Sequence, residues 1–388
     1  MDNSVSIKSI DNYNLENVKA TMANLFASID AEKLFKPNMK VLIKVNAGID
    51  ADPDLGLTTH PTVVQALVDL ISKTGAVCIV ADSPVKQYSL NYLEKIYFDT
   101  GMLEVANSTK CQLNHDLSTT QIKIPAGAKT KFTTVLSVAD SVDAIVVVGK
   151  VNVDNRLGFQ AVSQGLFGLI PGEMKNLYLN RLTTIADYNE YCLDLYTYFK
   201  NKLILNVLDG VVAVETNQSQ RMLSCLAMSK NMLSLEAVAN AIVGRNFNET
   251  ILKTAETRGE IDLSNAYKLV DGTIENFTLT DFDFGEIVNS SNIHKSKQSK
   301  KQYFRHNQQR LIIVPNKCKG CARCAKICPV GAITMKYDKM GELYAKINYD
   351  KCIFCNKCFT ACPYEIIRQK TPLGFKIITG SVNKYNEE

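Results

Sequence analysis

Two short segments near the end of this 388-residue chain repeat one cysteine pattern. They are NKCKGCARCAKICPVGAI (316–333) and DKCIFCNKCFTACPYEII (350–367). Each has four cysteines in the spacing C-x2-C-x2-C-x3-C, with a proline directly after the fourth. The chain has 12 cysteines and no signal-peptide features, which argues against a disulfide framework. The repeats therefore predict a metal-binding module near the C-terminal end.

The spacing of these cysteines indicates which metal they bind. Thiolates are the ligands of iron–sulfur clusters, and this run resembles that of bacterial ferredoxins, in which the fourth cysteine ligates the other cluster. We therefore assign one [4Fe-4S] cluster to Cys318, Cys321, Cys324 and Cys362, and a second to Cys352, Cys355, Cys358 and Cys328. Zinc is the alternative, because C-x2-C pairs also form zinc ribbons. Four ligands per zinc ion, however, do not explain the third and fourth cysteines of both repeats.

The charge of the chain changes sign along its length. Residues 1–290 carry 25 Lys/Arg and 33 Asp/Glu, a net −8, whereas residues 291–388 carry 19 and 6, a net +13. Such a step indicates two modules with different electrostatic partners. A solvated basic surface is the simple alternative, and nucleic acid is disfavoured because no arginine–aromatic binding pattern is present. We expect the basic end to bind an acidic electron carrier, a ferredoxin or a flavodoxin.

These features divide the chain into three parts. We expect an α/β domain over 1–289, a basic linker over 290–310 and a ferredoxin-type domain over 311–388. The linker has six Lys/Arg and no acidic residue. No apolar run reaches the roughly 20 residues that span a bilayer, and the N-terminus lacks the basic start and apolar core of a signal peptide. A cytoplasmic location is therefore expected.

Apolar strands alternate with helical segments in the first 290 residues. Predicted strands lie at 40–45, 76–84, 143–154 and 203–214, and PTVVQALVDLISKTG (61–75) predicts a helix that begins at proline and stops at glycine. Apolar strands between helices predict an α/β fold, a mostly parallel sheet with helices on both faces. In the C-terminal part, alternating residues on either side of an Asp-Lys-Met-Gly turn predict two strands, and hence a small α+β domain.

Polar residues stand at the carboxyl ends of the predicted strands, where ligands bind in such sheets. They are Asn46, Asp82, Ser83, Lys150, Asn152, Asp209 and Glu215. Each could serve alone as a cap or turn residue, but together they form a candidate pocket. His60 is a plausible helix-entry residue and a weak pocket candidate. The glycine-rich GLFGLIPG (165–172) is neither a dinucleotide-binding nor a Walker A loop.

Several of these segments carry a family resemblance. VLIKVN with TTHPTVVQALVDL, AVCIVADSP, ADSVDAIVVVGKV, GLFGLIPG and DGVVAVE, in this order, resemble domain of unknown function family 362 over about residues 38–285. The resemblance implies an iron–sulfur protein of a family that is widespread in anaerobes, often has a ferredoxin tail and has no settled common activity. Lys150, Asp209 and Glu215 match family motif positions. Asn152 and Asp154 stand where the family usually has lysine and histidine, and Gln164 and Gly165 where it usually has Lys-Asn.

Two functions follow as expectations. The first is an oxidoreductase whose two clusters pass single electrons to a substrate or a further small-molecule cofactor in the α/β domain. Lys150, Asp209 and Glu215 would then be catalytic, the lysine neutralising an anionic substrate and a carboxylate relaying a proton. Asp82 and Asn152 would bind the further cofactor. The second is a non-catalytic electron-transfer subunit that docks a partner enzyme; a cluster-handling protein and an oxygen sensor are further alternatives.

Overall fold

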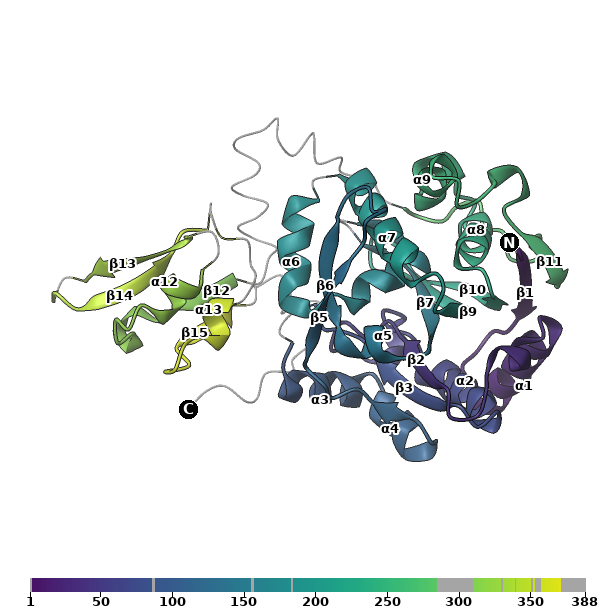
Figure 1. Ribbon diagram of the computed structural model, residues 1–388, viewed down its shortest axis with the longest axis horizontal. Coiled ribbons are helices and arrows are strands. Elements are labelled where there is room, and N and C mark those ends of the chain that lie inside the picture. Colours follow the sequence, from purple (N-terminus) through teal and green to yellow (C-terminus); the bar gives the residue numbers. More distant parts are fainter. Residues whose placement is uncertain are drawn as a thin grey trace. The chain divides into compact units, whose positions relative to one another are not determined.

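The structure, a computed structural model, describes residues 2–85, 88–154, 157–182, 184–284, 310–328, 331–338, 340–349, 352 and 357–370 (Figure 1). Most of the expected linker 290–310 and the expected ligand Cys355 lie outside the described residues. The chain divides into two compact units, Met1–Gly172 with Leu182–Ile287, and Glu173–Arg181 with Val288–Glu388.

In the described part of the first unit, nine strands form one mixed sheet in the order β11-β1-β10-β9-β7-β2-β3-β4, with β8 paired to β7. Their bounds are β1 (Ser4–Ser9), β2 (Lys40–Lys44), β3 (Val77–Ala81), β4 (Gln112–Leu113), β7 (Ala144–Asp154), β8 (Gly158–Gln160), β9 (Leu203–Val214), β10 (Gln220–Ser229) and β11 (Lys268–Asp271). The run from β9 to β4 is parallel throughout. β10 is antiparallel to both β9 and β1, and β8 is antiparallel to β7. A separate hairpin is formed by β5 (Thr119–Lys123) and β6 (Phe132–Leu136).

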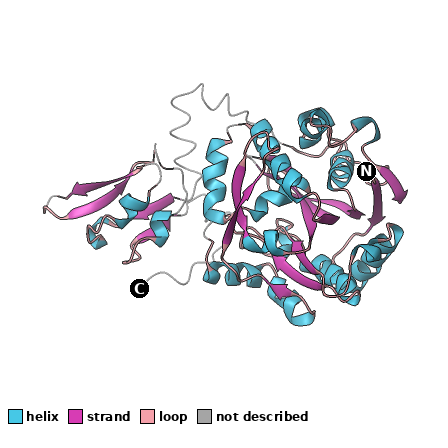
Figure 2. Ribbon diagram, in the orientation of Figure 1, coloured by secondary structure: helices cyan, strands magenta, loops and turns pink. Residues whose placement is uncertain are grey.

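Helices lie on both sides of this sheet, so the predicted α/β fold is confirmed (Figure 2). They are α1 (Leu15–Ser28), α2 (Pro61–Lys73), α3 (Leu90–Asp99), α4 (Met102–Ser108), α5 (Ser137–Ser141), α7 (Ile185–Phe199), α8 (Met232–Ile242) and α9 (Ile251–Thr257). Short 3-10 helices are η1 (Ala31–Leu34), η2 (Pro53–Leu55), η3 (Ser163–Leu169), η4 (Phe247–Glu249) and η5 (Leu263–Asn265). Helix α6 (Gly172–Arg181) falls in the second unit except for its first residue. No helix among the described residues has the length and apolarity needed to cross a membrane.

The inner strands and helices of the first unit bury apolar residues in its core. β7 is buried from Ala144 to Val151, as expected for a parallel strand covered on both faces. In α2 the buried residues Val63, Val64, Leu67 and Ile71 recur at helical spacing, so one face of the helix packs inward. α2 begins at Pro61, whose missing N–H costs nothing at a first helical position, and His60 caps it.

The order of the parallel strands places a topological switch point beside β2. From β2 the chain moves to β3 and β4 on one side, and it then returns to β7 on the other side. In open α/β sheets, ligands bind beyond the carboxyl ends of the strands at such a reversal. The residues of interest are therefore those that follow β2 and β3 and those in the second half of β7.

The second unit is built from two similar strand–helix–strand halves. The first half has β12 (Arg310–Ile313), α12 (Arg323–Ile327) and β13 (Ile333–Tyr337), with a 3-10 turn η6 (Pro315–Lys317). The second half has β14 (Leu343–Ile347), α13 (Lys357–Thr360) and β15 (Ile367–Lys370). The halves pair crosswise, β12 with β15 and β13 with β14, both antiparallel. A small core of aliphatic side chains also contains Cys324 and Cys358, and the predicted small α+β domain is confirmed.

Candidate functional site

Four of the predicted cluster ligands line one cavity in the second unit. Its walls include Cys318, Cys321 and Cys324 from the first repeat and Cys362 from the second. The cavity has an empty volume of about 310 Å³, part of it open solvent. Three cysteines of the first repeat and the last cysteine of the second thus surround one cavity, which is the crosswise ligand set expected of a two-cluster ferredoxin. Ligation by these four thiols stays a prediction.

The backbone of the first repeat explains how three of these thiols come together. The chain turns at Gly320 and Ala322, which both have positive φ, 64° and 58°. Ala322 precedes α12, and Cys324 lies inside this short helix. Left-handed residues reverse the chain direction within one or two positions. The loop can therefore wrap around one object and present Cys318, Cys321 and Cys324 toward it.

The second predicted ligand set is described in part. Cys358 belongs to the core of the second unit, Cys328 and Cys352 are partly buried and pack against this core, and Cys355 lies outside the described residues. The backbone N–H of Ala332 donates a hydrogen bond to Sγ of Cys328 at 3.2 Å. Hydrogen bonds to cysteine sulfur are among the factors that set the potential of such clusters.

In the first unit, a buried ion pair joins two of the predicted site residues. Lys150 of β7 lies directly opposite Asp209 of β9, and the Nζ–Oδ1 distance is 3.2 Å with both side chains fully buried. The hydroxyl of Tyr13 accepts a hydrogen bond from Lys150 at 2.7 Å and donates one to Oδ1 of Asp209 at 2.8 Å. The backbone N–H of His60 donates to Oδ2 at 3.0 Å. Asp209 therefore gathers donors from three other parts of the chain.

Burial governs the protonation of this network. Desolvation lowers the pKa of Lys150, although the carboxylate of Asp209 opposes that shift. Burial, followed by the charge of Asp209, raises the pKa of Tyr13. Burial also lowers the pKa of His60, whose ring stacks on the ring of Tyr13 with centroids 3.7 Å apart. A lysine with a depressed pKa beside a tyrosine hydroxyl is suited to acid–base chemistry.

A second buried ion pair lies at the ends of β2 and β3. Lys44 ends β2 and Asp82 follows β3, with Nζ 2.8 Å from Oδ1 and side chains 2% and 5% exposed. The other carboxylate oxygen of Asp82 accepts from the N–H of Ala47 at 2.7 Å. Gly168 of η3 lies against this pair, since a Cβ there would stand 2.3 Å from Nζ of Lys44. η3 thus covers the carboxyl ends of the central strands.

A buried carboxylate holds the start of η3 in place. Glu236 of α8 accepts hydrogen bonds from the N–H groups of Val162 and Ser163, both at 2.9 Å. Gln164 bonds locally, with its side-chain oxygen 3.3 Å from the N–H of Ala161. Glu236 and Gln164 therefore fix the start of the segment that covers these strand ends.

The remaining predicted residues serve turns and strand ends. Glu215 accepts hydrogen bonds from the hydroxyl of Ser219 at 2.9 Å and the N–H of Asp283 at 3.2 Å. Asn152 pairs with Gln160 in the β7–β8 hairpin and with Val214 of β9. The N–H of Asn46 donates to Thr59 at 2.8 Å. The structure thus brings Lys150 and Asp209 together and sets Asp82 beside Lys44, whereas Glu215 and Asn152 take other partners.

Two residues of the ion-pair networks, Lys44 and Tyr13, were not predicted from the sequence. Lys44 offered a signal, because it is a charged residue inside the apolar segment KVLIKV. Tyr13 offered none, since it precedes α1 and lies 137 positions from Lys150 in the chain. Its role depends on a contact that only the folded chain creates.

Comparison with known proteins identifies both parts of the chain. The profile Domain of unknown function (DUF362) matches residues 41–241, and a 4Fe-4S dicluster domain matches residues 317–366. The resemblance inferred from the sequence is confirmed.

Curated relatives match over short stretches. The arsenate respiratory reductase iron–sulfur subunit ArrB of Shewanella sp. (strain ANA-3) is 46% identical over 14% of this chain and 22% of that protein. The uncharacterized ferredoxin MJ0722 of Methanocaldococcus jannaschii is 35% identical over 15% of this chain and 73% of that protein. The chain thus spans about a fifth of the length of ArrB.

Among solved structures, the lactate racemase apoprotein from Thermoanaerobacterium thermosaccharolyticum aligns with a TM-score of 0.36 and 11% identity. The alignment covers 61% of this chain and 56% of that one, and at this score it carries no conclusion. The family profile, in contrast, matches more than half of the 388 residues. The chain belongs to the Domain of unknown function (DUF362) family and carries a 4Fe-4S dicluster domain near its C-terminal end.

Proposed function

We propose that this protein is an oxidoreductase in which two [4Fe-4S] clusters serve a substrate or further cofactor bound at the carboxyl ends of β2 and β7. The broader role, iron–sulfur electron transfer, is supported by the dicluster domain and by the likeness to a reductase iron–sulfur subunit. The finer proposal is carried by one observation: two Lys–Asp pairs, Lys44–Asp82 and Lys150–Asp209, are buried in the central strands beside the topological switch point.

Burying these pairs is costly, and stability does not explain it. Removing each ion from water costs several kcal/mol, and well-packed apolar residues of similar size are often as stable or more so. The two lysines also come from neighbouring strands, since β2 pairs with β7. Charges kept at such a cost, at the place where α/β sheets bind ligands, favour a chemical role.

The chain's own groups suggest what that role is. When bound, the clusters supply and accept single electrons. Reduction of a bound molecule also needs protons, and the sequence of groups Lys150, Tyr13 and Asp209 is linked by hydrogen bonds of 2.7 and 2.8 Å. Tyr13 is partly exposed whereas Lys150 and Asp209 are fully buried. Tyr13 would therefore pass a proton to the bound molecule and take one back from Lys150, while Asp209 would hold both groups in place. The network would regain the lost proton from water through Tyr13, its partly exposed member.

A second candidate is a non-catalytic electron-transfer subunit that docks a partner enzyme. One observation favours it: Asp209 already accepts from Tyr13 and His60 and pairs with the only buried cation beside it among the described residues, Lys150. A network so fully paired can be structural. By its name, the relative ArrB is the iron–sulfur subunit of an arsenate respiratory reductase. If this chain were such a subunit, its clusters would pass electrons to or from a partner enzyme.

An experiment on cofactor content separates the two candidates. Full-length protein would be purified anaerobically, and small molecules released by denaturation would be identified by absorbance and mass spectrometry. We expect a flavin, deazaflavin or other redox compound whose amount falls in Asp82→Asn, with iron content unchanged. The matched control is Asp69→Asn, which removes a carboxylate of the Lys19 surface pair (3.1 Å). Iron–sulfur absorbance with no released compound favours the electron-transfer subunit.

A further inference from the structure

We propose that an acidic one-electron carrier protein docks on the surface around the first-repeat cavity. We call this surface the first-cluster face. It consists of the exposed cations and the exposed isoleucine of segment 317–327, which carries three of the cavity's cysteines, together with Tyr364: Lys317, Lys319, Arg323, Lys326, Ile327 and Tyr364. Lys319 and Tyr364 line the cavity itself. The inference rests on the proposed electron-transfer function and adds where the carrier binds and by which groups.

Charge is the first argument for this face. Between Arg310 and Tyr337 the sequence has no Asp or Glu, and Lys317, Lys319, Arg323 and Lys326 are all exposed. An oxidised cubane with four thiolates carries a charge of about −2, which these four cations exceed. The face therefore stays positive with a cluster bound. A positive surface attracts an acidic protein and raises the rate of encounter.

Access to the cavity is the second argument. The walls of the cavity include Lys319, Cys321 and Tyr364. Cys321 is exposed, and the Tyr364 side chain is 50% exposed. A predicted cluster ligand therefore reaches the surface beside a cation and an aromatic ring. A protein that binds there would lie directly against the cavity.

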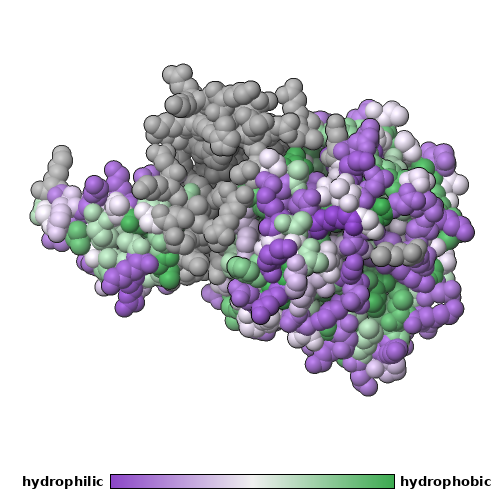
Figure 3. All heavy atoms as spheres, turned by 45° about the horizontal axis from the view of Figure 1, so that its top comes forward, coloured by the Kyte–Doolittle hydropathy of each residue, from purple (hydrophilic) through white to green (hydrophobic). Residues whose placement is uncertain are grey.

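The apolar groups of the face indicate that the partner is a protein. Ile327 is 46% exposed and lies one residue after Lys326 in α12. Protein interfaces combine exposed aromatic and aliphatic anchors with charged groups around them. Figure 3 shows hydrophobic and hydrophilic side chains side by side on the visible surface of this unit. A nucleic acid would use the cations but not the apolar anchors, so an acidic protein fits the face better.

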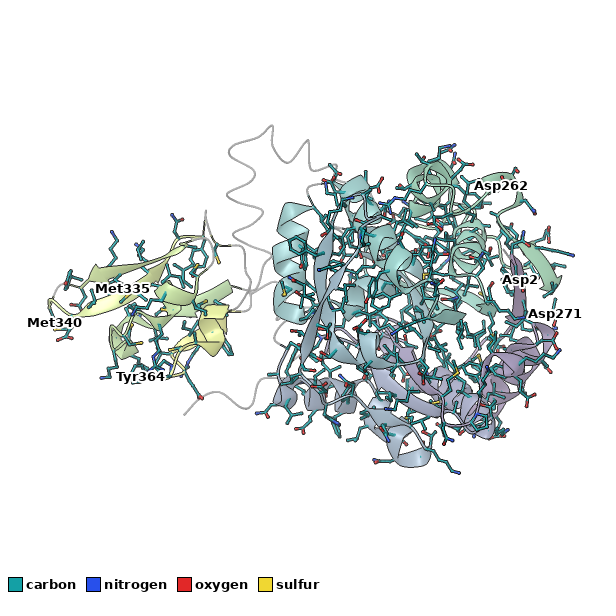
Figure 4. The ribbon with its side chains drawn as sticks, in the orientation of Figure 1. Asp2, Asp262, Asp271, Met335, Met340 and Tyr364 are labelled. Carbon is teal, nitrogen blue, oxygen red and sulfur yellow. The ribbon has the colours of Figure 1, made fainter. Side chains whose placement is uncertain are left out.

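A second exposed pair of lysines provides a matched control. Lys336 of β13 and Lys346 of β14 are exposed, and Lys346 pairs with Thr334, two residues before Lys336. Because side chains alternate along strands, both lysines lie on the hairpin face opposite Ala345, which lines the cavity. Figure 4 labels Met335, the neighbour of Lys336 in β13, and Met340 at the end of this hairpin.

The test compares two double variants of the full-length, cluster-loaded protein. Arg323→Glu with Lys326→Glu changes the first-cluster face, and Lys336→Glu with Lys346→Glu makes the same total charge change elsewhere. The probe is an acidic flavodoxin in its oxidised form, so that binding is measured by calorimetry without electron transfer. We expect the wild-type Kd to weaken as salt rises from 50 to 200 mM. The first variant should bind roughly tenfold or more weakly, and the second within about twofold of wild type.

Further measurements distinguish a wrong docking face from a wrong proposed function. Equal weakening in both variants, or in neither, overturns the docking face, as does a wild-type protein that binds neither flavodoxin nor an acidic ferredoxin. Binding of a DNA oligonucleotide through Arg323 and Lys326, without binding of flavodoxin, would assign the face to nucleic acid instead. Iron content and cluster potential must match wild type in both variants. If flavodoxin hydroquinone reduces all three proteins equally fast, the face is wrong but electron transfer stands. If loaded clusters accept no electrons even from photoreduced deazaflavin, the proposed function itself fails.

Discussion

The carboxylate of Asp209 is the residue on which the buried network depends. Removing it in Asp209→Ala would leave the ammonium of Lys150 buried without a counter-charge. We expect this variant to lose about 3–5 kcal/mol of unfolding free energy. Lys150→Met combined with Asp209→Ala should recover part of the loss, because no buried charge remains. The chain has no tryptophan, so urea unfolding would be followed by far-UV circular dichroism. A single variant within about 1 kcal/mol of wild type would contradict the buried pair.

Burial of His60 makes the free energy of unfolding depend on pH. Its neutral Nδ1 accepts a hydrogen bond from the N–H of Thr62, and burial lowers its pKa from the ordinary value of 6.5. The unfolded chain then binds more protons than the folded one just below pH 6.5, so stability should fall as the pH drops through this window. His60→Asn keeps an N-cap acceptor but does not titrate. We expect the unfolding free energy of wild type to fall more between pH 7.5 and 5.5 than that of His60→Asn; parallel curves would contradict this.

Individual residues show how far the sequence could predict the site. Asp82, Lys150 and Asp209 were identified because a polar residue within or directly after an apolar segment can be recognised from its neighbours in the sequence. Glu215 had the same signal, yet it stabilises a turn through Ser219. Sequence position cannot distinguish these cases, because the direction of each side chain depends on strand register. The strand pairing that sets Lys150 opposite Asp209 becomes known only with the fold.

At the scale of elements, η3 depends on a close approach by glycine. A Cβ on Gly168 would stand 2.3 Å from Nζ of Lys44 and 2.6 Å from Oδ1 of Asp82. Gly168→Ala should therefore displace η3 or the ion pair and cost about 1–3 kcal/mol. Gly165→Ala in the same element is the milder comparison, since among the described residues its Cβ would closely approach only Cγ1 of Val147, at 3.0 Å. Equal unfolding free energies for the two variants would show that η3 shifts to accommodate a Cβ at Gly168 without a specific loss of stability.

The two cysteine repeats are predicted to exchange a ligand between them, and this exchange can be tested. Cys362 belongs to the second repeat by sequence but lines the cavity of Cys318, Cys321 and Cys324. Cys362→Ala should therefore damage the cluster of the first repeat, and Cys328→Ala that of the second. Electron paramagnetic resonance of the reduced variants distinguishes the two clusters. Damage confined to the variant's own repeat would overturn the crosswise assignment.

Sequence patterns predicted the parallel strands better than the antiparallel ones. The strands β2, β3, β7 and β9 are apolar and buried, so each was visible as a local run. β1 and β10 were not identified, because their polar and apolar residues mix and their pairing joins residues more than 200 positions apart, such as Val5 and Ser229. The mixed character of the sheet therefore arises from contacts that no short segment encodes.

At the scale of the whole molecule, each unit has its own core and its own chemistry. The first unit carries the acidic part of the chain and the two buried Lys–Asp pairs. The second carries the cysteine repeats, and its aliphatic core is small. A core of that size contributes little stability by itself, so bound clusters should supply much of the folding free energy there. The first unit should not depend on iron.

This difference leads to a prediction about iron and stability together. Anaerobically prepared full-length protein should contain about eight irons and eight sulfides, as two cubanes require. A chain ending at Phe284 should contain no iron, and its first unit should unfold within about 1 kcal/mol of the same transition in the full-length protein. Iron and sulfide would be assayed chemically, and urea unfolding followed by circular dichroism. Four or fewer irons after full reconstitution, or stoichiometric zinc, would exclude two cubanes. A large loss of stability on truncation would show instead that the first unit needs the rest of the chain, whatever the iron content.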